Sequence, residues 1–130
     1  MIVATLDTGA LIAIERRKPR GMMLLKAARE FRARLLVPTP VVAEWWRGRT
    51  DDRDHIKAAL VVVPFPTAAA EAAGEVLGKL RGESERARLA IDVMVMAFAA
   101  TQGGALVYTT DVHDLESIGR HFPGVRVLAV

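Results

Sequence analysis

Short apolar runs alternate along the chain with longer stretches whose apolar positions recur at helical spacing. The apolar runs, each expected to be a strand, are residues 2–6, 35–37, 60–63, 106–108 and 125–130. Helices are expected at residues 8–15, 22–33, 40–47, 67–80 and 85–101, with a short one at 112–121. This alternation predicts a parallel sheet with helices on both faces.

The bulk composition predicts one domain spanning residues 1–130. With 130 residues and 52% hydrophobic content the chain can bury a single core, and it contains no linker or repeat that would divide it. The absence of Cys excludes disulfides and Cys-based zinc sites. The apolar N-terminus is interrupted by Asp7 and followed by the charged residues 15–20. We therefore expect neither a signal peptide nor a membrane anchor, and a cytoplasmic location.

The net charge says little about what the protein binds. Eighteen Lys and Arg against 15 Asp and Glu give a net charge of +3, which is compatible with a polyanionic partner and equally with ordinary solubility. Residues 48–58 are the most polar internal stretch and are expected to form an exposed loop or short helix. Thr67 is expected to cap the helix that begins there.

Acidic residues follow two of the predicted strands. Asp7 comes directly after the first run, and Asp111 comes after the fourth, with Asp114 three residues further on. Ligands of open α/β sheets bind beyond the carboxyl ends of the strands, so these side chains would share one crevice if their strands are neighbours. The simpler alternative is that Asp7 and Asp111 are helix N-caps and that Asp114 is a surface residue.

A further carboxylate stands in an apolar helix. In the segment LAIDVMVMAFAAT, residues 89–101, Asp92 has aliphatic and Met neighbours on nearly every face. Burying an unpaired carboxylate costs several kcal/mol. Arg88, one turn earlier, could pair with it, but such a pair contributes only about 0.2 to 0.5 kcal/mol on a helix surface. Glu44, in PTPVVAEWWRG, is either a fourth member of the acidic set or a solvated helix residue.

Clustered carboxylates need a counter-charge. At about 4 Å apart two of them repel by roughly 4 kcal/mol at an effective dielectric of 20, and a divalent cation would relieve that repulsion. Oxygen-only ligands suit Mg²⁺ or Mn²⁺, whereas the lack of Cys and of any paired-His spacing argues against zinc.

Four segments together resemble one known family. LDTGALIA at 6–13, VVAEWWRG at 41–48, AIDVMVMAFA at 90–99 and YTTDVHDL at 108–115 are similar, in order and spacing, to a PIN domain, specifically a VapC-type toxin ribonuclease. The resemblance implies a three-layer α/β/α sandwich with a central, mainly parallel sheet of about five strands. It also implies an endoribonuclease dependent on Mg²⁺, with Mn²⁺ as a substitute, that inhibits translation or growth. Its expected partners are an RNA substrate, a second copy of itself and a VapB-type antitoxin, with which it would form a hetero-oligomer.

The resemblance also assigns roles to residues. Asp7, Glu44 and Asp92 match the first three acidic positions of the family, and Asp111 and Asp114 compete for the fourth. Asp7 and Asp92, with Asp111 or Asp114, would hold the metal, and Glu44 would position water. Thr110 matches a small hydroxyl residue that could contact phosphate or water. The products would be a 5′-phosphate and a 3′-hydroxyl.

Basic residues near these segments are candidate RNA contacts, with surface solvation as the alternative. Arg16 follows the first helix, and Arg47 and Arg49 follow Glu44. The tandem Trp45 and Trp46 suggest packing or a partner surface rather than chemistry.

Two other enzyme or signalling classes fail on the sequence. A HAD-type phosphatase needs a second Asp two residues after the first, where this chain has Gly9, and a receiver domain needs an Asp after the third run, where VVVPFPT has none. The remaining rival is a catalytically inactive PIN-like module that binds RNA or a protein.

Overall fold

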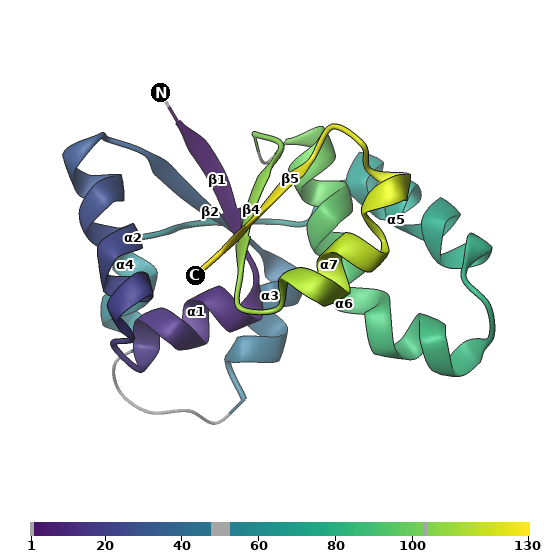
Figure 1. Cartoon of the computed structure of the whole chain (residues 1–130), viewed down its shortest axis with the longest axis horizontal. Coiled ribbons are helices and arrows are strands. Elements are labelled where there is room, and N and C mark those ends of the chain that lie inside the picture. The colour runs from purple at the N-terminus through teal and green to yellow at the C-terminus, as the bar shows by residue number, and fades with distance from the viewer. Residues whose placement is uncertain (1, 48–52, 103) are drawn as a thin grey trace.

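The computed structural model describes residues 2–47, 53–102 and 104–130, and its strands form a five-stranded sheet (Figure 1). The strand order is β3-β2-β1-β4-β5, and every neighbouring pair is parallel. The strands are β1 Val3–Leu6, β2 Arg34–Pro38, β3 Val61–Val63, β4 Leu106–Thr109 and β5 Arg126–Ala129. The parallel sheet predicted from the apolar runs is therefore confirmed.

Helices cover both faces of this sheet, which gives the expected α/β/α sandwich. They are α1 Thr8–Glu15, α2 Pro19–Glu30, α3 Thr39–Trp45, α4 Arg53–Ala58, α5 Thr67–Lys79, α6 Glu83–Thr101, α7 Val112–Ser117 and the 3-10 helix η1 Gly119–His121. In Figure 1, α1, α2 and α4 lie on one side of the sheet and α5, α6 and α7 on the other. Helix α3 contacts both α1 and α6, so it links the two helical layers beside the carboxyl end of β2.

Several boundaries differ from the sequence expectation for local reasons. Helix α2 begins at Pro19 rather than at residue 22, because Pro is well suited to a first helical turn. The N-cap predicted at Thr67 is wrong: Pro66 occupies that position in an extended conformation, and its carbonyl accepts from Ala70 N at 3.0 Å. The short helix expected at 112–121 divides into α7 and η1. Within the polar stretch 48–58, residues 53–58 form α4 and residues 48–52 lie outside the described residues.

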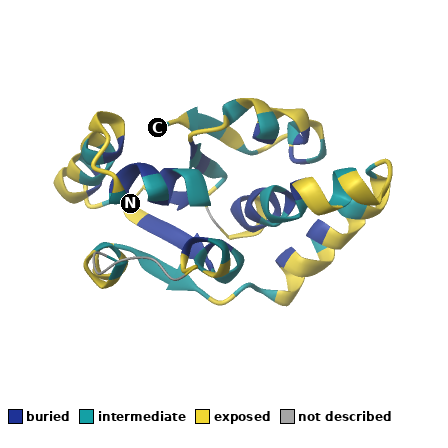
Figure 2. Cartoon of the chain, turned by 90° about the horizontal axis from the view of Figure 1, so that it is seen from below, coloured by how far each residue is buried: buried dark blue, intermediate teal, exposed yellow. Residues whose placement is uncertain are grey.

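The core lies between the sheet and the helices, and α6 contributes most to it. In its C-terminal half Val93, Val95, Met96 and Phe98 are fully buried, as the apolar pattern predicted. Figure 2 colours the chain by burial, with buried residues dark blue and exposed residues yellow. Truncating a buried aromatic such as Phe98 to Ala costs about 3 to 5 kcal/mol. This packing fixes α6 rigidly and with it the position of Asp92. No helix in the described part of the chain is both long and apolar enough to cross a membrane.

Candidate active site

Asp7 stands where β1 ends and α1 begins. It is the N-cap of α1, and its Oδ1 accepts from the backbone N of Ala10 at 2.8 Å. The capping alternative is therefore confirmed for this residue. The side chain is nevertheless nearly buried, with 7% exposure. Burial raises the pKa of Asp7, as do the charges of Glu44 and Asp111, while hydrogen bonds from Thr109 and Ala10 act in the opposite direction.

Glu44 lies in the last turn of α3 and is half-buried. The Thr8 hydroxyl donates a hydrogen bond to Glu44 Oε1, joining the first residue of α1 to α3. Glu44 is thus held by a neighbouring element rather than solvated alone, and its charge acts on both Asp7 and Asp92.

Asp92 lies half-buried on α6, and its carboxyl has the largest pKa shift of the five acids. Burial, followed by the charges of Asp7, Asp114, Glu44 and Asp111, raises the pKa of Asp92 to about 7. None of the ion pairs found among residues 2–47, 53–102 and 104–130 involves it. The pairing with Arg88 considered from the sequence is wrong, because Arg88 contacts Glu85 at 3.0 Å and Asp114 at 3.3 Å instead.

Asp111 and Asp114 both belong to the start of α7. Asp111 is the N-cap, and its Oδ1 accepts from Asp114 N at 3.2 Å, so its capping role is also confirmed. Asp111 is exposed, whereas Asp114 is half-buried and paired with Arg88. Both charges act on Asp92.

Two hydroxyl residues stand at the carboxyl end of β4, Thr109 as its last residue and Thr110 directly after it, and they differ in burial. Thr110, the residue expected to contact phosphate or water, is exposed. It lies against α1, since a Cβ added to Gly9 would be 2.2 Å from Thr110 Oγ1. Its neighbour Thr109 is fully buried, hydrogen-bonds Asp7, and accepts from Asp111 N at 2.9 Å.

Sequence reasoning missed two hydroxyl residues that contact the acids, Thr8 and Thr109. Thr8 directly follows Asp7, and Thr109 is a polar residue at the end of an apolar strand. The argument that singled out Asp92, a polar side chain where apolar ones are expected, could have found Thr109. The contact between Thr8 and Glu44 joins residues 36 positions apart, so no local pattern indicates it.

The basic candidates are placed differently from one another. Arg47 is exposed, and its Nε donates to the Glu44 carbonyl at 2.9 Å, so it lies at the edge of the site. Arg16 caps the C-terminus of α1, the opposite end from Asp7. Arg49 lies outside the described residues. Trp45 belongs to the core, while Trp46 packs edge-to-face on it and lies under the Arg53 guanidinium at 4.3 Å.

The topology explains why the acids meet. β1 and β4 are neighbouring parallel strands, with Leu6 paired with Tyr108, so Asp7 and Asp111 leave the same edge of the sheet. Helices α3 and α6 contact each other and carry Glu44 and Asp92 there. The charges of Asp7, Glu44, Asp111 and Asp114 all act on Asp92, so the five carboxylates lie close together, and we call the place where they meet the acidic crevice. The strand-end argument predicted this proximity for Asp7, Asp111 and Asp114.

The carboxylate oxygens of these acids are suitable ligands for a divalent metal, but the structure does not arrange them around one. Across the described residues, no group of three or more Asp, Glu or His side chains is arranged to hold an ion. Asp7 and Asp111 each use one oxygen in a helix cap, and Arg88 holds Asp114. Carboxylates that repel one another adopt such separate partners. Their oxygen-only character suits Mg²⁺ or Mn²⁺.

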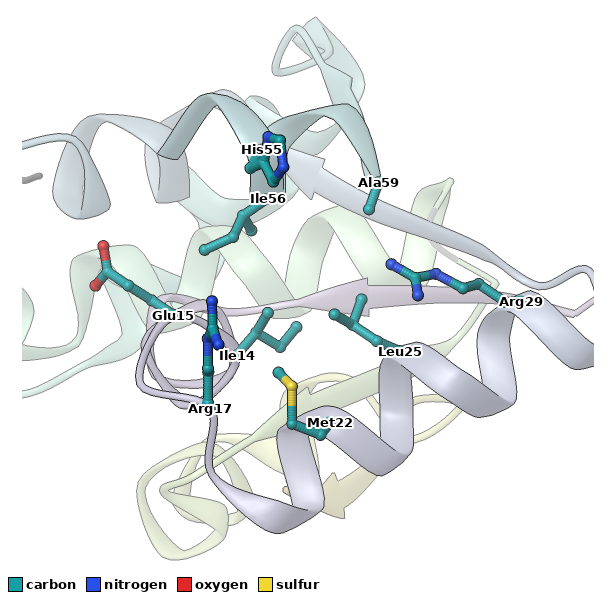
Figure 3. Close-up of a pocket in the computed structure, with 9 residues that line it drawn as sticks. All are labelled: Ile14, Glu15, Arg17, Met22, Leu25, Arg29, His55, Ile56 and Ala59. Carbon is teal, nitrogen blue, oxygen red and sulfur yellow. The ribbon is translucent and has the colours of Figure 1, made fainter. Parts of the chain in front are cut away.

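A separate hollow lies between α1, α2 and α4 (Figure 3). It has a volume of about 230 Å³, and Met22 and Leu25 of α2 line it together with Ile14 and Ile56. We call it the apolar groove. None of the five acids lines it, so it is distinct from the acidic crevice.

The family model of the PIN domain matches residues 4–120. The chain belongs to the PIN domain family. No curated protein sequence matches it. This PIN domain is similar to the crystal structure of VapBC2 from Rickettsia felis bound to a promoter DNA fragment, with a TM-score of 0.68, 13% identity, and coverage of 100% of this chain and 99% of the other.

It is also similar to the crystal structure of DNA-bound VapBC from Salmonella typhimurium. The TM-score is 0.65 at 20% identity, over 99% of this chain and 98% of the other. At these identities the likeness establishes the fold of this PIN domain and leaves its chemistry to be argued from its own residues.

Proposed function

We propose that this PIN domain is a metal-dependent endoribonuclease and the VapC-type toxin of a toxin–antitoxin pair. The observation that carries the proposal is Asp92, a half-buried carboxyl with a pKa of about 7, surrounded by four other acids and joined to no cation in the described residues. A site built this way is stabilised by binding a divalent cation. PIN-domain nucleases generally use such metals. We further propose that residues 1–130 act as one domain.

Each acid of the site has a proposed role in the reaction. Asp7 and Asp92 would hold the cation, with Asp111 or Asp114 completing its shell. The bound Mg²⁺ or Mn²⁺ would supply charge neutralisation at the phosphoryl group and make the attacking water more acidic. Glu44, oriented by the Thr8 hydroxyl, would accept the proton of the attacking water.

The bonds made and broken follow from this arrangement. Water oxygen attacks phosphorus, the bond from phosphorus to the 3′ oxygen breaks, and the 3′ oxygen takes a proton from solvent. The products are a 5′-phosphate and a 3′-hydroxyl. Thr110 and Arg47 stand at the edges of the crevice, where they would contact the phosphate groups of the RNA. Arg16, at the far end of α1, would contact RNA only beyond the site.

A protein partner is part of the proposal. Both VapBC structures named above are assemblies bound to DNA, which supports a VapB-type antitoxin for this chain and a hetero-oligomer with it. We further propose that the chain forms a homodimer and acts in the cytoplasm. The apolar groove suits an apolar helix face of that antitoxin, because its floor is aliphatic. Acidic residues beside that face would meet Arg17 and Arg29, at positions away from Glu15, which also lines the groove. An Arg or Lys from the antitoxin tail would compensate the acidic crevice and block it.

The test is cleavage of RNA by the purified chain. We expect hydrolysis in Mg²⁺ or Mn²⁺, none in EDTA, and fragments whose new 5′ ends carry phosphate. Sequencing of the RNA ends after controlled expression would identify the target. RNA that stays intact with both metals, while still binding the protein, would instead favour the inactive RNA-binding module.

A further inference from the structure

A hollow with a basic rim lies beside the acidic crevice, on the other side of Arg88. Its volume is about 350 Å³, and it is formed by the end of α5, the turn into α6, α7 and η1. Three of its lining residues are the cations Lys79, Arg81 and Arg120. We propose that this hollow, the basic pocket, binds backbone phosphates of the RNA strand next to the phosphate that is cut. The inference rests on the proposed nuclease function and adds a second contact region to it.

The charges of the pocket are uncompensated. No acid forms an ion pair with Lys79, Arg81 or Arg120 within the part of the chain that the structure describes. The one acid that lines the pocket, Glu85, is bound by Arg88 at 3.0 Å, and Arg88 also pairs with Asp114; against three cations, this one acid leaves the lining with a net positive charge. Three exposed cations around one concavity repel each other, and an anion in the hollow relieves that repulsion.

The positive charges of Arg120 and Lys79 act on the neighbouring side chain of His121. The pKa of His121 is lowered, first by burial and then by the positive charges of Arg120 and Lys79. Arg120 Nε lies 3.4 Å from His121 Nε2. Lys79 of α5 and Arg120 of η1 are more than 40 positions apart in the chain, yet both lie close enough to His121 to affect its pKa.

The pocket has a rigid floor and one polar wall. Leu89 of α6 and Ile118 after α7 are both buried and line it. Ser117, also in the lining, donates from Oγ to the Asp114 carbonyl at 2.6 Å. One wall of the pocket and the acid Asp114 therefore belong to the same short helix.

Arg88 connects the basic pocket to the acidic crevice. Arg88 contacts Glu85, which lines the pocket, and Asp114, whose charge acts on Asp92. A nucleic acid strand with one phosphate at the carboxylates therefore has its neighbouring phosphates within reach of the basic rim. Positively charged grooves that follow a backbone in this way bind single strands without reading sequence.

An acidic peptide is the competing occupant, and we favour RNA for a geometric reason. The apolar groove already offers a protein partner an aliphatic surface at α1, α2 and α4, whereas the basic pocket adjoins the crevice where a phosphodiester would react. The two occupants give different results in the experiment below.

The test compares two triple variants of equal charge change. The first is Lys79→Gln with Arg81→Gln and Arg120→Gln. The control is Lys26→Gln with Arg34→Gln and Arg126→Gln, which removes three exposed cations, two of them at the amino ends of β2 and β5, the opposite edge of the sheet. All six side chains are exposed, so both variants should fold, which the melting temperature checks.

The readout is the affinity for fluorescent single-stranded RNA in EDTA, measured across a salt series. We expect the pocket variant to lose about 10- to 100-fold in affinity near 0.1 M salt and its salt slope to fall by about 2, at roughly 0.7 per lost phosphate contact. The control should change by less than about threefold. In Mn²⁺, the KM for a long RNA should rise while a dinucleotide, too short to reach the pocket, is cut as by the wild type.

Three results decide the matter. Equal losses in both triple variants, or none in either, would overturn the proposal. Unchanged RNA affinity with lost binding of an acidic partner peptide would also overturn it, in favour of a protein docking site. A wild-type chain that binds RNA through the pocket but cuts none would support the pocket and contradict the nuclease function, so the two failures are distinguishable.

Discussion

Arg88 and Asp114 form an ion pair of 3.3 Å between α6 and α7, although Arg88 lies one helical turn from Asp92 on the same helix. The arginine turns toward Glu85 and Asp114 and leaves Asp92 facing other carboxylates. The charge that the sequence places in an apolar helix is therefore compensated by no local partner. A proton or a bound cation can compensate it, and the metal site that we propose rests on the second of these.

Replacing Asp92 should stabilise the metal-free protein, and only at high pH. The pKa of Asp92 rises to about 7 in the folded state from an ordinary 3.8, so between these values the folded chain binds more protons than the unfolded chain. Stability then falls as pH rises through that window. With allowance for solvent screening, Asp92→Asn should raise the free energy of unfolding by about 1 kcal/mol at pH 8 and by little at pH 4.

Urea unfolding in EDTA at the two pH values measures this change, with the exposed Asp54→Asn as the control. If Asp92→Asn lost stability at pH 8, the carboxylate would be serving a structural contact instead.

Arg88→Gln should tighten Mn²⁺ binding several-fold. Removing the guanidinium takes a positive charge from beside the acids and releases Asp114 from its ion pair. The pair is exposed, so the free energy of unfolding should change by less than about 1 kcal/mol. Calorimetric titration with Mn²⁺ gives the affinity. Weaker binding would mean that the pair holds Asp114 in a ligating position, and would identify Asp114 rather than Asp111 as the fourth acid.

Thr8→Val should lower kcat about tenfold and leave KM nearly unchanged. The valine retains the shape of the side chain but cannot donate to Glu44 Oε1, so the carboxylate loses its orientation. A hydrogen bond to a charged group contributes about 1.5 to 3 kcal/mol. Steady-state cleavage kinetics provide the measurement, and Thr8→Ser, which retains the hydroxyl, should restore most of the rate. Equal losses in the Val and Ser variants would argue against a positioning role.

Gly9→Ala should interact with Thr110 in a double-mutant cycle. The new Cβ would be 2.2 Å from Thr110 Oγ1, so the threonine must rotate or α1 must shift. Alone, the change should destabilise by about 1 kcal/mol. On a Thr110→Ala background the clash is absent, and the helix preference of Ala over Gly should stabilise by about 0.5 to 1 kcal/mol. Thermal unfolding of the four proteins gives the coupling, and additive effects would contradict the contact.

Much of the fold follows from the sequence because two patterns of apolar residues dominate it, namely short continuous runs and helical spacing. The apolar runs mark all the strands of the sheet, and the 3.6-residue spacing marks the longer helices. The errors lie at the ends, where single residues decide. Pro19 extends α2 toward the N-terminus and Pro66 takes the cap position expected for Thr67. Such boundaries depend on backbone angles that hydrophobic pattern does not encode.

The sequence predicted which acids lie in the acidic crevice better than it predicted which side chains contact them. Asp92 is anomalous by itself in an apolar helix, whereas Asp7 and Asp111, at strand ends, were candidates only when the acids were taken together. The partner of Arg88 lies 26 residues away, and that of Thr8 lies 36 away. These contacts depend on how α3, α6 and α7 pack, which the local pattern cannot supply. The two cap contacts, three residues long, were foreseen.

The most direct test of a metal-dependent nuclease is the single-turnover rate of RNA cleavage in Mn²⁺ for wild type, Asp7→Asn, Asp92→Asn and the control Asp54→Asn. Each of the two site variants removes the charge of a proposed metal ligand, with an amide NH2 in place of one carboxylate oxygen, and leaves the side-chain size unchanged. We predict that the wild type and Asp54→Asn cut at equal rates, and that both site variants are slower by at least about 100-fold, or some 2.7 kcal/mol. Cleavage by Asp7→Asn and Asp92→Asn at the wild-type rate would contradict the account.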